Sequence, residues 1–144
     1  MIPEFTDDGL LPPGRHNAAW GEFESRFGYN SWRRMLLSGL LRALLELKRA
    51  GVGLAYLDGS FVTEKAVPGD YDACWDPGGV DPTLLDPVLL DFSNKRVKQK
   101  AKYGGELFVS SSVSGPDGRT FLEFFQEDQD GVPKGIVALD LGGL

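Results

Sequence analysis

The sequence predicts a single α/β or α+β domain of two layers, with a mixed sheet of about five strands covered by helices. A chain of 144 residues that is 42% hydrophobic is long enough to bury one core, and a second domain is not expected. One long leucine-rich segment has helical periodicity, and short apolar runs of strand length are separated by turns rich in glycine, proline and serine. Helical segments before and between these runs favour a sheet that helices cover.

The first part of the chain contains an arm and two helices in this prediction. Residues 1–16 are expected to form an extended arm, because prolines and glycines recur there, and residues 17–144 form the domain. Aromatic residues at helical spacing predict a helix over Asn17–Phe27. Ser31–Ala50 is predicted as a longer helix capped by Ser31, and its leucines form a broad stripe at positions 36, 37, 40, 41, 44, 45 and 47. The stripe is expected in the core, and its width also allows a partner helix or a homodimer contact.

The rest of the chain alternates between strands and helices. The predicted strands are Gly51–Leu57, Tyr71–Trp75, Glu106–Ser110, Thr120–Gln126 and Ile136–Leu141, and the predicted helices are Asp81–Asp91 and Asn94–Tyr103. Pro87 interrupts the first of these helices. Residues 111–119 and 128–135 are rich in turn-forming residues and are predicted as hairpin loops between the last three strands.

A glycine-serine turn and two aspartates form the most informative pattern in the chain. Gly59 and Ser60 follow the apolar run that ends at Leu57, and a turn into a short helix there would direct backbone N–H groups at an anion such as a phosphate. Asp70 and Asp72 alternate with apolar residues, so on a strand their carboxylates lie on one face about 6 to 7 Å apart. Mg²⁺ prefers such oxygen ligands together with substrate phosphates. The alternative is a surface turn in which both acids are hydrated.

The combined pattern resembles the signature of the DNA polymerase beta-like nucleotidyltransferase superfamily, especially of its minimal members. That signature is a hydrophobic residue, Gly-Ser, roughly ten residues and then Asp-hydrophobic-Asp-hydrophobic, and it corresponds to Leu57-Asp58-Gly59-Ser60 and Asp70-Tyr71-Asp72-Ala73. The sequence around this signature, with Leu-Asp-Phe-Ser-Asn and Lys-Tyr-Gly-Gly-Glu-Leu-Phe downstream, resembles a small uncharacterised family of bacterial and phage-borne nucleotidyltransferase-like proteins. The resemblance implies a nucleotidyltransferase-like fold, phosphate binding by the glycine-serine turn and metal binding by the two aspartates.

The superfamily carries a third carboxylate on a later strand, where it helps to hold the metals and can accept the proton of the attacking hydroxyl. Glu123, within the aromatic run Thr120–Gln126, is the candidate in this sequence. A lone acid in such a run is costly to bury unpaired, so Glu123 either faces a metal or emerges at a sheet edge. Asp58 departs from the signature because it adds negative charge where phosphates dock, and it either pairs locally or marks a weakened nucleotide site.

Basic residues are concentrated in one segment of a chain whose net charge is −6. Residues 95–102 carry five basic side chains and no acid, and on a helix Lys95, Lys98 and Lys102 share one face. This stripe either binds the phosphates of a triphosphate or of an RNA acceptor, or is a solvated helix face. Lys98 and Lys102, together with Lys65 near the turn, are the expected nucleotide-binding cations.

The expected function is Mg²⁺-dependent transfer of a nucleoside monophosphate from a nucleoside triphosphate, such as ATP, to a hydroxyl of a protein, an RNA or a small molecule. Two Mg²⁺ ions are expected, held by Asp70, Asp72 and Glu123. The alternative is a catalytically silent nucleotidyltransferase-like module that binds a partner protein, for example in a toxin–antitoxin or phage-defence system.

Other functional classes are not favoured by the composition. No apolar stretch approaches the length that a membrane span requires, and the first residues lack the pattern of a signal peptide, so a cytoplasmic protein is expected. Cys74, the single cysteine, is expected to be a buried thiol, and His16, the single histidine, lacks the partner ligands of a zinc site.

Overall fold

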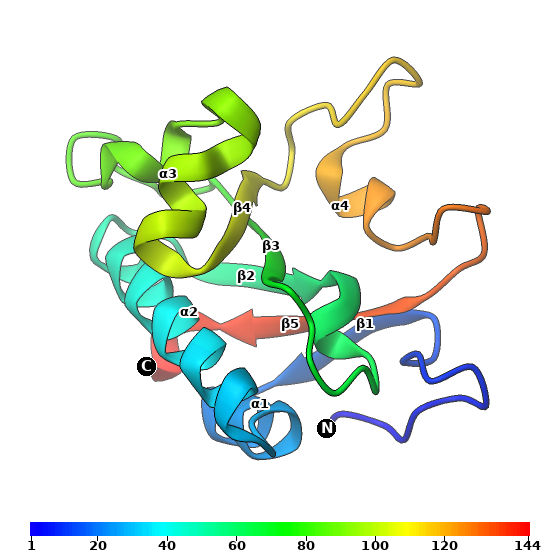
Figure 1. Ribbon diagram of the computed structural model, residues 1–144. Helices are drawn as coiled ribbons and strands as arrows, with labels where there is room; N and C mark the ends of the chain where they lie inside the picture. Colours follow the sequence, from blue (N-terminus) through cyan, green and yellow to red (C-terminus); the bar gives the residue numbers. More distant parts are fainter.

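The computed structural model describes residues 1–144 and has five strands in one mixed sheet, with four α-helices packed around it (Figure 1). The strands are β1 Gly14–Ala18, β2 Leu54–Asp58, β3 Tyr71–Trp75, β4 Gly105–Val109 and β5 Gly135–Asp140, in the spatial order β1-β5-β2-β3-β4. β1 is parallel to β5 and β3 to β4, whereas β2 is antiparallel to both of its neighbours. The predicted α+β class with a mixed five-stranded sheet is confirmed.

Helices α1 (Trp20–Phe27) and α2 (Ser31–Arg49) cover one face of the sheet, and the main core lies between them and the strands (Figure 1). The residues of α2 that face this core are Leu36, Leu37, Leu40, Ala43, Leu44 and Leu47. The leucine stripe is therefore mostly core, although Leu45 is 46% exposed. The cap of α2 is Asn30 rather than Ser31, because the Asn30 side chain accepts a hydrogen bond from the backbone N–H of Arg33.

The opposite face of the sheet carries a smaller core, which the short helix α4 (Phe121–Phe124) and the residue after it cover. Successive side chains of a strand alternate between the two faces. Tyr71, Ala73 and Trp75 of β3 therefore pack in the main core, and Cys74 packs in the smaller one. Cys74 is a buried free thiol, as the sequence predicts, and burial raises its pKa.

The edge strand β1 lies where the sequence predicts an arm. Residues 14–18 pair in parallel with β5, from Gly14 opposite Gly135 to Ala18 opposite Leu139. Their side chains are mostly polar and exposed, because a strand at the edge of a sheet needs few buried side chains, and the hydrophobic pattern of a strand is therefore missing. The prediction of an extended arm up to residue 16 is corrected at this point.

The predicted strand Thr120–Gln126 is wrong, because this segment forms α4. The Thr120 side chain accepts a hydrogen bond from the backbone N–H of Glu123, and the Glu123 carboxylate accepts one from the backbone N–H of Thr120. This capping box stabilises the start of a helix in a run whose aromatic content favours a strand. Segments 111–119 and 128–135 consequently join strands to α4, and each takes part in a single antiparallel bridge (Val113 with Thr120, Glu127 with Pro133) in place of the predicted hairpin between two strands.

The connection between β3 and β4 is less helical than predicted. Of Asp81–Asp91, only Pro87–Leu90 is helical, as the short 3-10 helix η2. Helix α3 (Ser93–Tyr103) packs against α2 and β4 and begins with three left-handed residues, Asn94 to Arg96, whose φ angles lie between 49° and 59°. This irregular turn interrupts the continuous basic face that the sequence predicts. None of the helices has both the length and the apolar character that a membrane crossing requires.

Candidate active site

Three acidic side chains form a row across β2, β3 and β4. Asp58 is opposite Asp72 in the pairing of β2 with β3, and Asp72 is opposite Glu106 in the pairing of β3 with β4. Directly paired residues point to the same face of a sheet, which here is the face of the smaller core. We call Asp58, Asp72 and Glu106 the acid row. The next row on this face consists of Tyr56, Cys74 and Phe108.

Asp70 forms a compact group of carboxylates with two members of the row. Oxygen atoms of Asp70, Asp72 and Glu106 lie within 4.8 Å of one another, and all three residues are half-buried. Burial, followed by the charges of Asp70 and Glu106, raises the pKa of Asp72 to about 7. Burial and then Glu106 also raise the pKa of Asp70. The protein thus holds this group with too little positive charge to compensate its burial.

Asp58 is the most deeply buried member of the acid row. Its side chain is inaccessible to solvent, and neither carboxylate oxygen has a hydrogen-bond partner. Burial and then the charge of Asp72 raise the pKa of Asp58 well above its ordinary value, while Lys134 acts in the opposite direction. Because an unpartnered ionised carboxylate is very unfavourable in the interior, Asp58 either carries a proton or needs a cation.

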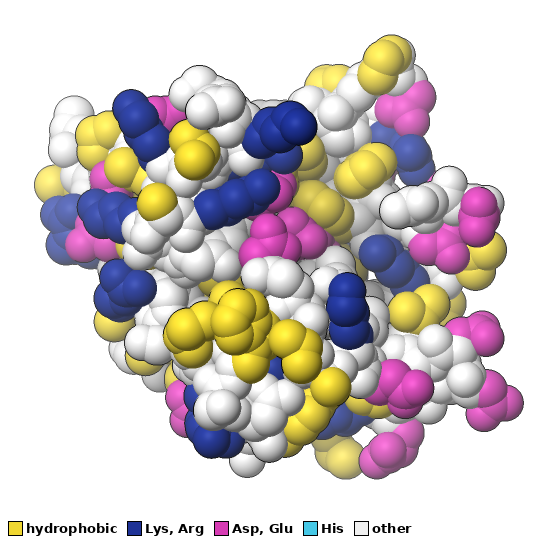
Figure 2. All heavy atoms as spheres, viewed as in Figure 1, with side chains coloured by type: hydrophobic (Ala, Val, Ile, Leu, Met, Phe, Trp, Pro, Cys, Tyr) yellow, Lys and Arg dark blue, Asp and Glu magenta, His cyan; other side chains and the backbone are white.

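Basic side chains of α3 border the acid row on the side of β4. Glu106 forms ion pairs with Nε of Arg96 at 3.1 Å and with Nζ of Lys100 at 2.9 Å. The same two basic residues oppose the rise in the pKa of Asp70. In the view of Figure 2, basic side chains lie next to acidic ones near the middle of the molecule. An anion bound at this border would therefore meet both hydrogen-bond donors and positive charge.

The glycine-serine turn lies beside the row because β2 ends at Asp58. The chain continues as a short 3-10 helix, η1 (Gly59–Val62), and the first N–H groups of a helix have no partner within it. Gly59 has a φ angle of +72°, and a Cβ atom at this position would lie 2.2 Å from Oδ2 of Asp72. Only glycine combines this backbone conformation with so close an approach to the aspartate.

The N-terminal part of α2 holds the segment that joins the turn to Asp70. The buried guanidinium of Arg33 donates hydrogen bonds to the backbone carbonyls of Phe27, Phe61, Thr63 and Lys65. Further carbonyls between residues 64 and 68 accept hydrogen bonds from the side chains of Tyr29, Asn30 and Trp32. Segment 61–68 is thereby attached to α2, and this attachment positions the turn relative to the aspartates.

A cleft of about 580 Å³ opens along the turn. Gly59, Ser60 and Asp72 contribute to one side of it, and residues between Arg119 and Lys134 contribute to the other. Lys134 forms no ion pair, yet its charge counteracts the rise in the pKa of Asp72. The cleft therefore combines backbone donors, a carboxylate and an unpaired cation, which together suit a phosphate group with a bound metal.

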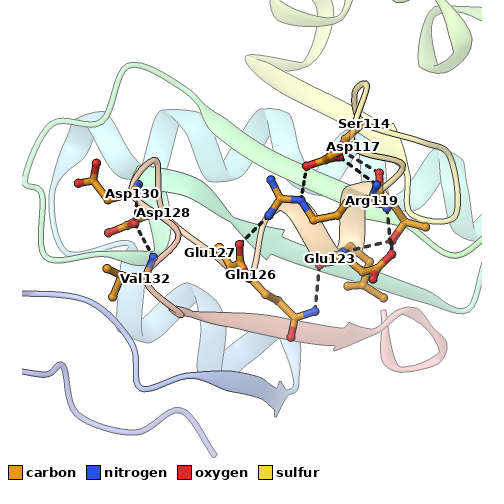
Figure 3. A network of polar contacts seen from close by, with 11 residues as sticks. Ser114, Asp117, Arg119, Glu123, Gln126, Glu127, Asp128, Asp130 and Val132 are labelled. Atoms are coloured by element: carbon orange, nitrogen blue, oxygen red, sulfur yellow. Dashed lines mark hydrogen bonds and ion pairs between the residues drawn. The ribbon is translucent and has the colours of Figure 1, made fainter.

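The outer wall of the cleft is held by its own polar network (Figure 3). Arg119 forms ion pairs with Asp117 at 2.7 Å and with Glu127 at 2.6 Å. The carboxylate of Asp128 accepts hydrogen bonds from the backbone N–H groups of residues 130 and 132, which closes a tight turn. The network gives shape to a segment that has little regular structure of its own.

The predicted third carboxylate, Glu123, lies apart from the group that contains the two aspartates. It is exposed in the capping box of α4, where hydrogen bonds from Thr120 lower its pKa. Glu106 occupies the third position of the carboxylate group instead. Sequence reasoning missed Glu106 because only the register of two strands far apart in the chain places it opposite Asp72.

The predicted nucleotide-binding lysines lie outside the carboxylate group and the cleft. Lys98 forms an ion pair with Asp91 at 3.3 Å, and Lys102 forms one with Asp86 at 2.5 Å. Lys65 is exposed, and only its backbone takes part in the attachment to α2. The basic residues next to the acids are instead the two neighbours on α3 that bind Glu106.

The fold and the site define an α+β protein with an acid row and a glycine-serine turn at one end of its sheet. The chain belongs to a family of unknown function, DUF6932, whose family model matches residues 3–140 and so includes every element of the site. No curated protein and no solved structure matches the chain significantly.

Proposed function

We propose that this protein is a Mg²⁺-dependent nucleotidyltransferase that moves a nucleoside monophosphate from a nucleoside triphosphate to a hydroxyl of a protein, an RNA or a small molecule. The observation that carries the proposal is the convergence of Asp70, Asp72 and Glu106 within 4.8 Å beside the glycine-serine turn. The resemblance of the Gly59-Ser60 and Asp70–Asp72 pattern to the DNA polymerase beta-like superfamily supports the same reaction class. A cytoplasmic location is part of this proposal.

The carboxylate group fits divalent cations on chemical grounds. All of its donors are oxygen atoms, which Mg²⁺ prefers, and burial together with neighbouring carboxylates raises the pKa values of Asp70 and Asp72. Asp58 is the next member of the acid row, and its two buried carboxylate oxygens also lack a partner that would compensate their charge. Two Mg²⁺ ions would be held by Asp70, Asp72 and Glu106, and when bound they would stabilise negative charge on the phosphates and activate the acceptor hydroxyl.

The remaining groups of the site have roles that follow from their positions. Backbone N–H groups of Gly59 and Ser60 would bind the terminal phosphates in the cleft, and Lys134 would neutralise part of the charge of the departing pyrophosphate. Arg96 and Lys100 would orient the Glu106 carboxylate through their ion pairs. A carboxylate of the group would accept the proton of the attacking hydroxyl.

The first test is binding of each nucleoside triphosphate in the presence of Mg²⁺. A ligand at about 100 times its dissociation constant stabilises the folded protein by roughly 2.7 kcal/mol, which a thermal melt detects. We expect this stabilisation in the parent protein and its loss in the double variant Asp70→Asn, Asp72→Asn. Glu106→Gln should also lose it, whereas Glu123→Gln, the matched control, should keep it.

The second test is transfer itself. Incubation with triphosphates labelled at the α-phosphate and with cell extract should leave label on a protein, an RNA or a small molecule, and the double aspartate variant should leave none. Stabilisation by no nucleotide and no labelled acceptor would overturn the proposal.

A specific observation favours a second candidate, a catalytically silent module that binds a partner protein in a toxin–antitoxin or phage-defence system. Asp58 adds a buried carboxylate beside the phosphate turn, and Lys98 and Lys102 are already paired with acids of the same chain. Both features weaken attraction for a triphosphate. Absence of any nucleotide-dependent stabilisation, together with a stable stoichiometric complex with a partner protein, would favour this module.

A further inference from the structure

A second, apolar pocket lies on the far side of the acid row from the glycine-serine turn. Its volume is about 370 Å³, within the range of small-molecule sites. The residues that line it are Phe92, Arg96, Phe108, Val109, Ser112, Val113 and Phe121. They come from the residue before α3, from α3 itself, from β4 and the loop after it, and from α4. We call this site the aromatic pocket.

The three phenylalanine rings of the aromatic pocket are nearly parallel. The planes of Phe92 and Phe108 differ by 7° with ring centroids 6.0 Å apart, and those of Phe108 and Phe121 differ by 14° with centroids 4.3 Å apart. The outermost ring, Phe92, is 40% exposed. Parallel aromatic faces with one open side favour a flat ring as their ligand, because stacking maximises contact between planar groups.

Arg96 connects the aromatic pocket to the acid row. Its guanidinium carbon lies 5.5 Å from the ring centroid of Phe108, and its Nε donates a hydrogen bond to Glu106. Glu106 and Phe108 are two residues apart on one face of β4, so they are about 6 to 7 Å apart along the strand. A single bound molecule could thus contact the pocket and the carboxylates together if an aromatic ring and a phosphate are joined by a short linker.

We propose that the aromatic pocket binds the base of the nucleotide, with a purine bound more tightly than a pyrimidine. This inference rests on the proposed function, since it places the terminal phosphates at the glycine-serine turn, the α-phosphate at the carboxylate group and the ribose between that group and the aromatic pocket. A purine offers the larger flat surface for stacking on the partly exposed ring of Phe92, at the open end of its stack with Phe108, and Arg96 and Ser112 provide hydrogen-bonding groups for its edge. A pocket of this volume accommodates one fused ring system but not the side of a protein helix.

The test compares ligands with and without a base. Affinities of the parent protein for Mg²⁺–ATP, Mg²⁺–CTP and Mg²⁺–tripolyphosphate are measured by calorimetry. We expect ATP to bind about tenfold or more tightly than tripolyphosphate, with CTP between them, because stacking on aromatic side chains accounts for that difference. Equal affinity for ATP and tripolyphosphate would overturn the base pocket while leaving the proposed function intact. Binding of neither would overturn both proposals.

Variants of Phe92 test whether the aromatic pocket causes the difference in affinity between ATP and tripolyphosphate. Phe92→Ala should lower the affinity for ATP about tenfold and leave that for tripolyphosphate unchanged. Leu90→Ala is the matched control, since Leu90 is exposed to a similar extent and does not line the pocket. Phe92→Trp keeps a stacking surface and should retain tight binding of ATP, which separates stacking from a general loss of folding. An unchanged affinity for ATP in Phe92→Ala would contradict the inference.

Discussion

Asp58 and Asp72 are directly paired across β2 and β3, and both carboxylate oxygens of Asp58 are buried without a hydrogen-bond partner. Two acids in such contact cannot both be ionised at low cost. The arrangement is destabilising for the isolated chain and becomes favourable when positive charge enters the site. Groups with strongly perturbed pKa values at a cleft are typical of functional sites, and here Asp72 lines the cleft while Asp58 is buried beside it.

The substitution Asp72→Asn should stabilise the protein at pH 8 and have little effect at pH 4. Because the folded-state pKa of Asp72 is raised to about 7, the folded protein binds more protons than the unfolded chain between pH 4 and 7, and stability falls as pH rises through this window. The variant does not lose stability in this way, so its free energy of unfolding at pH 8 should exceed that of the parent by at most about 4 kcal/mol. Urea unfolding at several pH values measures it.

Asp8→Asn is the control for this experiment, because Asp8 is exposed and makes no hydrogen bond or ion pair. The free energy of unfolding of this variant should stay close to that of the parent, because Asp8 is an isolated surface residue. A stability difference for Asp72→Asn that does not grow between pH 4 and pH 8 would show that folding does not raise the pKa of Asp72.

Affinity for Mg²⁺ should fall steeply as the pH is lowered below 7. Metal binding requires the ionised carboxylate, and Asp72 with a pKa of about 7 is largely protonated at pH 6. Binding should therefore release protons near neutral pH. Calorimetry in buffers of different ionisation enthalpy counts these protons. No proton release at pH 6.5 would mean that the cation does not use Asp72.

Gly59→Ala should destabilise the protein by roughly 2 to 4 kcal/mol. The φ angle of +72° disfavours any residue with a Cβ atom, and that atom would lie 2.2 Å from Oδ2 of Asp72. The variant should also lose nucleotide-dependent stabilisation. Gly53→Ala is the matched control, since a Cβ atom there meets nothing within 4 Å, and its melting temperature should stay within a few degrees of the parent.

Arg33→Met should loosen the segment between the turn and Asp70. It removes four hydrogen bonds that the guanidinium donates to backbone carbonyls and leaves most of these carbonyls without a partner, so we expect a loss of roughly 2 to 4 kcal/mol. Hydrogen exchange of residues 61–66 should accelerate. The control is Arg34→Met, because exposed Arg34 donates only to the carbonyl of Gly28. Equal exchange rates in the two variants would contradict a role of Arg33 in attaching this segment to α2.

Local patterns were sufficient for much of the fold. The leucine spacing of α2 predicts a buried helix, and the alternation around Asp70 and Asp72 predicts β3 with the correct bounds. They failed where a single contact overrides composition. The capping box at Thr120 converts an aromatic run into a helix, and pairing with β5 makes a strand of the polar residues 14–18.

The sequence by itself determined the α+β class, the glycine-serine turn and the spacing of the two aspartates, because each depends on neighbours within about a dozen residues. Only the tertiary structure decided which further side chains join them. Glu106 meets Asp72 through the parallel register of β4, and the aromatic pocket forms from segments as distant as Phe92 and Phe121. Strand register and packing across the whole chain determine these contacts, and no local pattern in the sequence predicts them.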